Sequence, residues 1–136
     1  MSSNSLIEAL RMEVMPDVSV LILALSGQEP WAGALRGWIY EGRLLLSAVV
    51  VHEMYLELSY AEIISLGELL HLFPVQVPTK EMYEQAAGIR QGLMQRGIQI
   101  SLADALIAAQ AIVINAGLVS IDPKRYEGIA ITLLNV

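Results

Sequence analysis

The chain has 136 residues, a net charge of −6 and no cysteine, and 55% of its residues are hydrophobic. This length fits one domain with a well-buried core. The absence of cysteine excludes disulfides, thiolate zinc sites and cysteine nucleophiles. The chain also lacks the excess of basic over acidic residues that marks most nucleic-acid-binding proteins. Any binding of a polyanion must therefore depend on local charge or on a metal ion.

The apolar content raises the question of a membrane-spanning segment. The longest apolar run without a charge lies between Asp104 and Asp122, and Gln110, Asn115 and Gly117 interrupt it. A spanning helix needs about 20 apolar residues, and this run is shorter. We therefore expect a buried helix followed by a buried strand, and no contact with a membrane.

Charged side chains interrupt the N-terminal segment at Glu8, Arg11 and Glu13. A secretory signal has an apolar stretch in this region. Residues 1–12 are therefore expected to be a short lead-in to a single domain that spans 1–136. Together with the absence of cysteine, this favours a cytoplasmic protein.

The first half of the chain is predicted to begin with a short strand at 13–17, although Pro16 cannot donate to a sheet. Capping and terminating residues then delimit the helices that follow. The expected order is a helix from Ser19 to Gly27, a helix from Pro30 to Gly42, a strand at 44–46, a helix capped by Ser47 and a helix at 60–72.

The second half continues the same alternation of short strands and helices. The expected order is a strand within 73–78, a helix from Thr79 to Gly97, a helix from Ser101 to Gly117, a strand at 118–122 and a final strand at 131–136. The helix from Ser101 to Gly117 is the most hydrophobic stretch of the chain. Short apolar strands that alternate with helices indicate an α/β fold with a parallel sheet covered on both faces.

Four carboxylates stand apart from those on polar helix faces and turns. Asp17 follows a strand, Glu53 interrupts an apolar helix, Asp104 lies in the first turn of the most hydrophobic helix and Asp122 ends a strand. In open α/β sheets, ligands bind outside the carboxyl ends of the strands, so these four side chains could converge there. Their mutual repulsion would require a cation, and oxygen ligands suit Mg²⁺ or Mn²⁺.

Each of the four acids also has a local explanation. Asp104 fits a helix cap with Ser101, Asp122 precedes a proline as turn-forming aspartates do, and Asp17 is placed to cap a helix. Glu53 could belong to a solvated stripe with Glu57. The joint interpretation is preferred because one site explains all four positions at once.

The sequence around these acids resembles the PIN domain, and in particular the VapC-type toxin ribonucleases of type II toxin–antitoxin systems. The matching blocks are PDVSVLIL around Asp17, SAVVVHEMYLEL around Glu53, SLADALIAAQA around Asp104 and LVSIDPKRYEGI around Asp122. They follow one another in the order of the family, from about residue 13 to the C-terminus.

This resemblance implies a three-layer α/β/α sandwich with a central parallel sheet of four to five strands. It also implies a Mg²⁺- or Mn²⁺-dependent endoribonuclease that cleaves single-stranded RNA, a homodimer and an antitoxin partner. Asp17, Glu53, Asp104 and Asp122 would be the catalytic and metal-binding residues. Ser19 and Ser120 would orient them.

Four basic residues are candidates for contacts with RNA phosphates: Arg36, Arg43, Lys124 and Arg125. Ordinary surface charge is the competing interpretation of all four. A competing function is a catalytically silent PIN-fold protein that acts as a partner-binding or dimerisation module. Substitution of the four acids would leave the phenotype of such a module unchanged.

Overall fold

The structure is a computed structural model that describes residue 7 and residues 11–136. Most of the predicted lead-in at 1–12 lies outside these residues. The elements are β1 (Val14–Pro16), α2 (Val18–Leu25), α3 (Trp31–Tyr40), β2 (Leu46–Ser47), α4 (Ala48–Glu57), α5 (Tyr60–Leu72), β3 (Val75–Gln76), α6 (Lys80–Met94), α7 (Leu102–Ile114), β4 (Gly117–Val119), the 3-10 helix η1 (Pro123–Tyr126) and β5 (Thr132–Leu133).

All paired strands in the described part are parallel, as the sequence predicts. One sheet has the order β1-β4-β5, and β2 pairs with β3. A parallel bridge between Val14 and Leu44 links the two, because the N–H of Val14 donates to Arg43 and its carbonyl accepts from Leu45. Pro16, two residues further on, has no N–H to continue this ladder, so β1 can accommodate it at its end.

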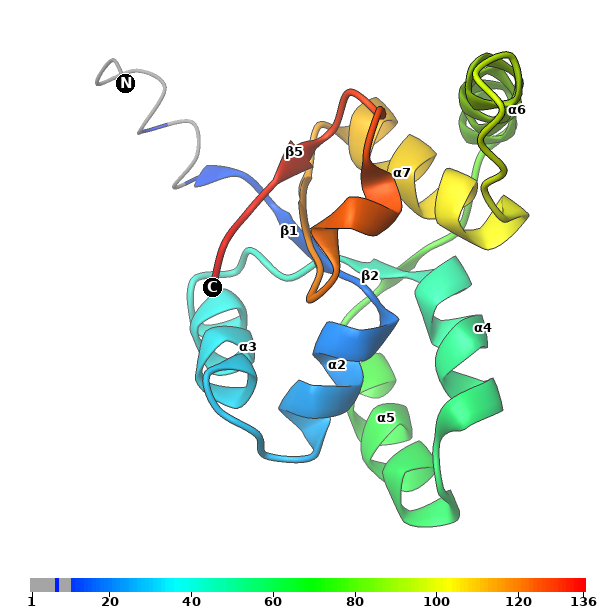
Figure 1. The fold of residues 1–136 in the computed structure, drawn as a ribbon. Coiled ribbons are helices and arrows are strands. Elements are labelled where there is room, and N and C mark those ends of the chain that lie inside the picture. Colours follow the sequence, from blue (N-terminus) through cyan, green and yellow to red (C-terminus); the bar gives the residue numbers. More distant parts are fainter. Residues whose placement is uncertain (1–6, 8–10) are drawn as a thin grey trace.

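The helices lie on both sides of the strands, which gives the expected α/β arrangement of a PIN-like fold (Figure 1). In this view α2, α3 and α5 lie below the strands and α7 lies above them, with α6 packed on α7. The main core joins strand residues such as Met15 and Leu118 to helix residues such as Leu21 and Ile107. A smaller cluster fills the contact between α6 and α7.

Several helix starts follow the sequence prediction closely. Ser47 caps α4, Thr79 caps α6 and Ser101 caps α7, each by accepting a hydrogen bond from a backbone N–H in the first turn. The predicted helix at 60–72 matches α5, where Ser59 and Glu62 form a reciprocal capping box. Such caps satisfy N–H groups that have no partner inside the helix.

Several predicted boundaries were wrong. The strand predicted at 44–46 is found at Leu46–Ser47, and the final strand predicted at 131–136 covers only Thr132–Leu133. Asp17, not Ser19, caps α2, so this helix begins one residue before Ser19. Helix α7 ends at Asn115, which adopts a left-handed conformation, and Gly117 is already the first residue of β4. The strand predicted at 118–122 ends at Val119, which leaves Asp122 in the loop that starts η1.

Among the described residues, none of the helices combines the length and the apolar character needed to cross a bilayer.

Candidate functional site

Asp17 lies at the carboxyl end of β1, directly before α2. Its N–H donates to the carbonyl of Val119 over 3.0 Å, and its Oδ1 accepts from the N–H of Val20 over 3.3 Å. Its exposed fraction is only 1%. The chain therefore fixes this carboxylate between the end of one strand and the N-terminus of one helix, where the helix dipole favours negative charge.

Burial raises the pKa of the Asp17 carboxyl above its usual value, and repulsion from Asp104 adds to this effect. Hydrogen bonds from Ser120 and Val20 and the charge of Arg125 act in the opposite direction. The net increase means that the surroundings do not fully compensate the negative charge of Asp17. A further cation nearby would stabilise that charge.

Asp104 occupies the first turn of α7, and its N–H donates to the Oγ of Ser101 over 3.1 Å. Its side chain is 22% exposed, and its Oδ2 lies 3.8 Å from the Nε of Arg125 in η1. The capping explanation and the site explanation are therefore compatible here, because the backbone of Asp104 serves the cap while its carboxylate faces Arg125.

Asp122 is exposed and precedes η1. Its N–H donates to the Oγ of Ser120 over 3.0 Å, and its carbonyl accepts from the N–H of Arg125. Ser120 thus contacts two of the four predicted acids, since it also donates to Asp17. Ser19 lies in the first turn of α2 and lines a cavity beside Asp104. The orienting roles of Ser19 and Ser120 stay predictions.

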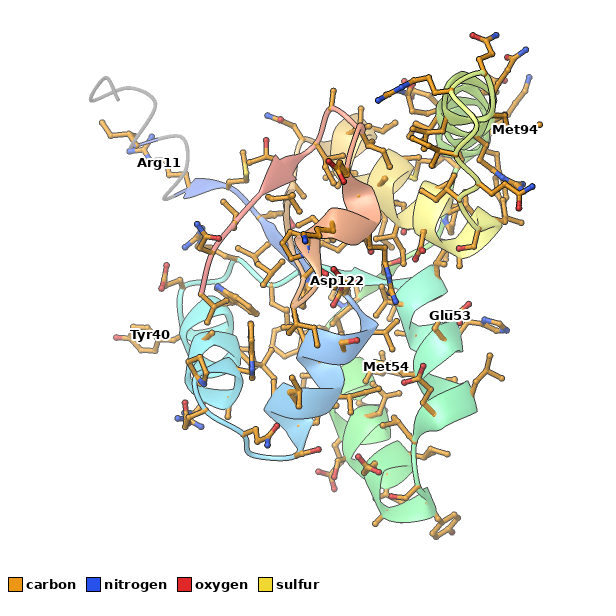
Figure 2. The ribbon with its side chains drawn as sticks, viewed as in Figure 1. Arg11, Tyr40, Glu53, Met54, Met94 and Asp122 are labelled. Atoms are coloured by element: carbon orange, nitrogen blue, oxygen red, sulfur yellow. The ribbon has the colours of Figure 1, made fainter. Side chains whose placement is uncertain are left out.

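Glu53 lies on α4, away from Asp122 (Figure 2). Its side chain is 33% exposed and its Oε1 lies 3.6 Å from the Nδ1 of His52. The sequence left open a site carboxylate in an apolar helix or a solvated stripe with Glu57, and the structure shows a half-buried side chain. Glu53 and Glu57 both line a cavity of about 220 Å³ with Asp104 and Arg125.

Asp104 is the carboxylate shared by the two cavities around the predicted site. The first, of about 220 Å³, also contains Glu53, and the second, of about 650 Å³, contains Asp122. Within the described part of the chain, no three side chains of His, Asp or Glu are grouped closely enough to form a ready metal site. The structure thus brings Asp17 and Asp104 into electrostatic contact, and places Glu53 in one of the cavities at Asp104 and Asp122 in the other.

Tyr126 is a site residue that the sequence reasoning missed. It is 1% exposed, and its hydroxyl makes no hydrogen bond of ordinary geometry among the described residues. Burial raises the pKa of Tyr126 well above its usual value, Asp17 and Asp104 raise it further, and Arg125 lowers it. No local pattern in the sequence around Tyr126 indicates that its hydroxyl is buried.

Gln110 is another polar residue whose role the sequence did not reveal. It is fully buried, accepts a hydrogen bond from the hydroxyl of Ser47 and donates to the carbonyl of Gln76 over 3.0 Å. It therefore ties α7 to the ends of β2 and β3. This connection joins α7 to both strands of the second sheet.

The four basic candidates separate into two groups. Lys124 and Arg125 line the 650 Å³ cavity with Asp104 and Asp122. Arg36 lies on α3 and forms an exposed ion pair with Glu29, which precedes that helix. Arg43 lies at the other end of β1, where it donates to the carbonyl of Met12 and pairs with Glu41.

A family model described as PIN domain matches residues 14–129. No curated protein matches the chain. Several solved structures resemble it over nearly their whole length, each with low sequence identity.

The crystal structure of VapBC2 from Rickettsia felis, bound to a DNA fragment from its promoter, contains a chain that is 21% identical, with a TM-score of 0.78 and coverage of 91% of this chain and 98% of that one. For FitAcB from Neisseria gonorrhoeae the identity is 24%, the TM-score 0.73 and the coverage 90% and 96%. For a toxin–antitoxin complex from Klebsiella pneumoniae the identity is 21% and the TM-score 0.72, with coverage of 90% of this chain and 97% of that one. At these identities the similarity shows a shared fold.

Proposed function

This chain belongs to the PIN domain family, and from that premise we propose that it is a metal-dependent endoribonuclease acting as the toxin of a toxin–antitoxin pair. The observation that carries the proposal is the pair formed by Asp17 and Asp104. One carboxylate is fully buried at a strand end, the other lies at a helix N-terminus, and each acts electrostatically on Arg125. Structural needs alone do not explain two acids that repel each other at this place.

The donor set suits a hard divalent cation. Asp17 and Asp104 offer carboxylate oxygens, which Mg²⁺ and Mn²⁺ prefer, and the raised pKa of Asp17 indicates a charge that remains undercompensated. Asp17 and Asp104 would hold the ion. Asp122 and Glu53 would add negative charge near it from the two cavities that Asp104 lines. When bound, a divalent ion supplies charge neutralisation at a phosphodiester and makes water more acidic.

Local positive charge near the acids offsets the acidity of the whole chain. Arg96, Lys124 and Arg125 line the 650 Å³ cavity that contains Asp104 and Asp122. Such cations would position the phosphates of a strand without reading its bases. The proposed RNA path therefore crosses this cavity, next to the carboxylates.

The proposal includes a homodimer and an antitoxin. The similar structure from Klebsiella pneumoniae is a toxin–antitoxin complex, and that from Rickettsia felis is a VapBC assembly on DNA. A toxin that cuts cellular RNA would act in the cytoplasm. Co-expression with the product of a small adjacent reading frame, followed by size-exclusion chromatography, tests both parts of this assembly.

Cleavage of single-stranded RNA by the purified protein tests the catalytic part. We expect cleavage in Mn²⁺ that disappears in EDTA and falls by at least about 100-fold in Asp17→Asn and Asp104→Asn, because each removes a charge at the reacting centre. Glu68→Gln, which changes an exposed glutamate on α5, is the matched control and should remain active. Absence of metal-dependent cleavage, or equal rates in all variants, would favour the silent partner-binding module.

A further inference from the structure

Arg125 is a cation that lies beside two of the predicted acids, Asp104 and Asp17. Its Nε is 3.8 Å from the Oδ2 of Asp104, and it also attracts Asp17. Burial lowers the pKa of Arg125, but Asp104, Tyr126 and Asp17 outweigh this effect and raise it. The guanidinium thus experiences a negative environment that it only partly neutralises, since one positive charge faces two carboxylates.

An arginine in this position is a permanent counterion. Its guanidinium does not lose its proton in proteins, so it cannot become neutral when another cation approaches. A divalent ion carries twice its charge and binds carboxylate oxygens at about 2 Å. The ion and the guanidinium would therefore compete for the same carboxylates.

The surroundings give Arg125 room to move. Its side chain is 41% exposed, and it lines both the 220 Å³ cavity beside Glu53 and the 650 Å³ cavity beside Asp122. A rotation of the side chain toward the second cavity would move the guanidinium without entering the core. In the second cavity the guanidinium would lie beside Lys124, where the proposed function places RNA phosphates.

The hydroxyl of Tyr126 is buried and also lies against Arg125. No hydrogen bond of ordinary geometry reaches it among the described residues, but Arg125 interacts with it and lowers its pKa, while Asp17 and Asp104 raise that pKa. The guanidinium of Arg125 therefore faces a buried hydroxyl as well as the two carboxylates.

We infer that Arg125 is the built-in counterion of the carboxylate site, which holds Asp17 and Asp104 together until a divalent cation displaces it. This inference rests on the proposed metal site and adds a residue that sets the affinity of that site. Arg125 would then lower the metal affinity, and its displacement would couple metal binding to the cavity proposed for RNA.

Calorimetric titration with Mn²⁺, in the absence of RNA, tests this inference. In Arg125→Gln we expect the Kd for Mn²⁺ to fall about 10-fold, because removal of an opposing charge near a carboxylate has effects of this order. Arg90→Gln removes the same charge from an exposed position on α6 that lines neither cavity, and its Kd should match that of the wild type. An equal Kd in the wild type and Arg125→Gln would overturn the inference and leave the metal site intact. Absence of Mn²⁺ binding in every variant would overturn both.

Thermal unfolding in EDTA provides a second readout that needs no metal. Arg125→Gln should lower the melting temperature, because Asp17 and Asp104 then repel each other without a counterion. Adding Asp104→Asn to Arg125→Gln should restore it, and the double-mutant cycle isolates the interaction between the two residues. Additive effects of the two substitutions would contradict the counterion role.

Discussion

The N–H of Asp17 donates to the carbonyl of Val119 over 3.0 Å, so the last hydrogen bond between β1 and β4 is made by the residue that carries the buried carboxylate. The register of the sheet therefore fixes the backbone of Asp17. Its side chain in turn caps α2. Because the same residue ends a strand pair and starts a helix, the position of the carboxylate depends on the frame of the fold rather than on a mobile loop.

The pH dependence of stability should reveal the undercompensated charge of Asp17. Its pKa is raised in the folded state, so its stabilising contribution is fully present below the unfolded pKa near 3.8 and is lost as the pH rises through the folded pKa. In EDTA at about pH 7, Asp17→Asn should therefore be more stable than the wild type, since asparagine keeps the acceptor for Val20. The difference in urea midpoints should shrink as the pH falls toward 4, and an Asp17→Asn variant that is less stable at every pH would contradict this.

Ser101 should couple the stability of α7 to the position of Asp104. In Ser101→Ala, loss of the acceptor for the N–H of Asp104 should lower the free energy of unfolding by about 1 kcal/mol and weaken Mn²⁺ binding. Asn at this position should restore both, because it supplies an equivalent acceptor. Ser65→Ala, on an exposed part of α5, is the control and should change little. Urea unfolding and calorimetry provide the two measurements, and unchanged values in Ser101→Ala would disprove the coupling.

Gln110 should matter for stability alone. Gln110→Leu leaves the hydroxyl proton of Ser47 and the carbonyl of Gln76 without their partner, and an unsatisfied buried group costs about 1–3 kcal/mol. We expect a loss of about 2 kcal/mol in urea unfolding, with Mn²⁺ affinity unchanged in the folded protein. Gln91→Leu, at an exposed position of α6, controls for the added apolar surface. An equal loss in the two variants would show that the buried connection contributes nothing.

Glu53 should contribute less to cleavage than Asp104. Glu53 is half-buried beside His52 and shares one cavity with Asp104, whereas Asp104 belongs to both cavities and pairs with Arg125. Single-turnover rates should therefore fall by about 10-fold in Glu53→Gln and by at least about 100-fold in Asp104→Asn, in keeping with a peripheral and a central charge. If Glu53→Gln had the larger effect, the pairing of Asp17 with Asp104 would not be the centre of the site.

The helix starts were predictable because their signals are local. Ser47, Thr79 and Ser101 each cap a helix through hydrogen bonds that span three residues or fewer, and such contacts leave a recognisable pattern in the sequence. The cap of α2 was misassigned because Asp17 and Ser19 both have suitable side chains. Only the hydrogen bond between Asp17 and Val119 decides between them, and that contact joins distant parts of the chain.

The candidate site was only partly predictable for the same reason. The flanking blocks identified Asp17 and Asp104, and the structure places them near Arg125. The ion pair of Arg125 and the buried hydroxyl of Tyr126 depend on how η1 packs against α7, which no local pattern encodes. The exposure of Glu53 depends on the neighbours of α4 in space, so the sequence could not decide between a site carboxylate and a solvated stripe with Glu57.

Crystals soaked in Mn²⁺ and measured for anomalous scattering test the central claim most directly, because the ion is located without reference to activity. The account predicts an anomalous peak within about 2–2.5 Å of carboxylate oxygens of both Asp17 and Asp104, with the guanidinium of Arg125 turned away from Asp104. A peak elsewhere, or no peak at a Mn²⁺ concentration that supports RNA cleavage, would contradict it.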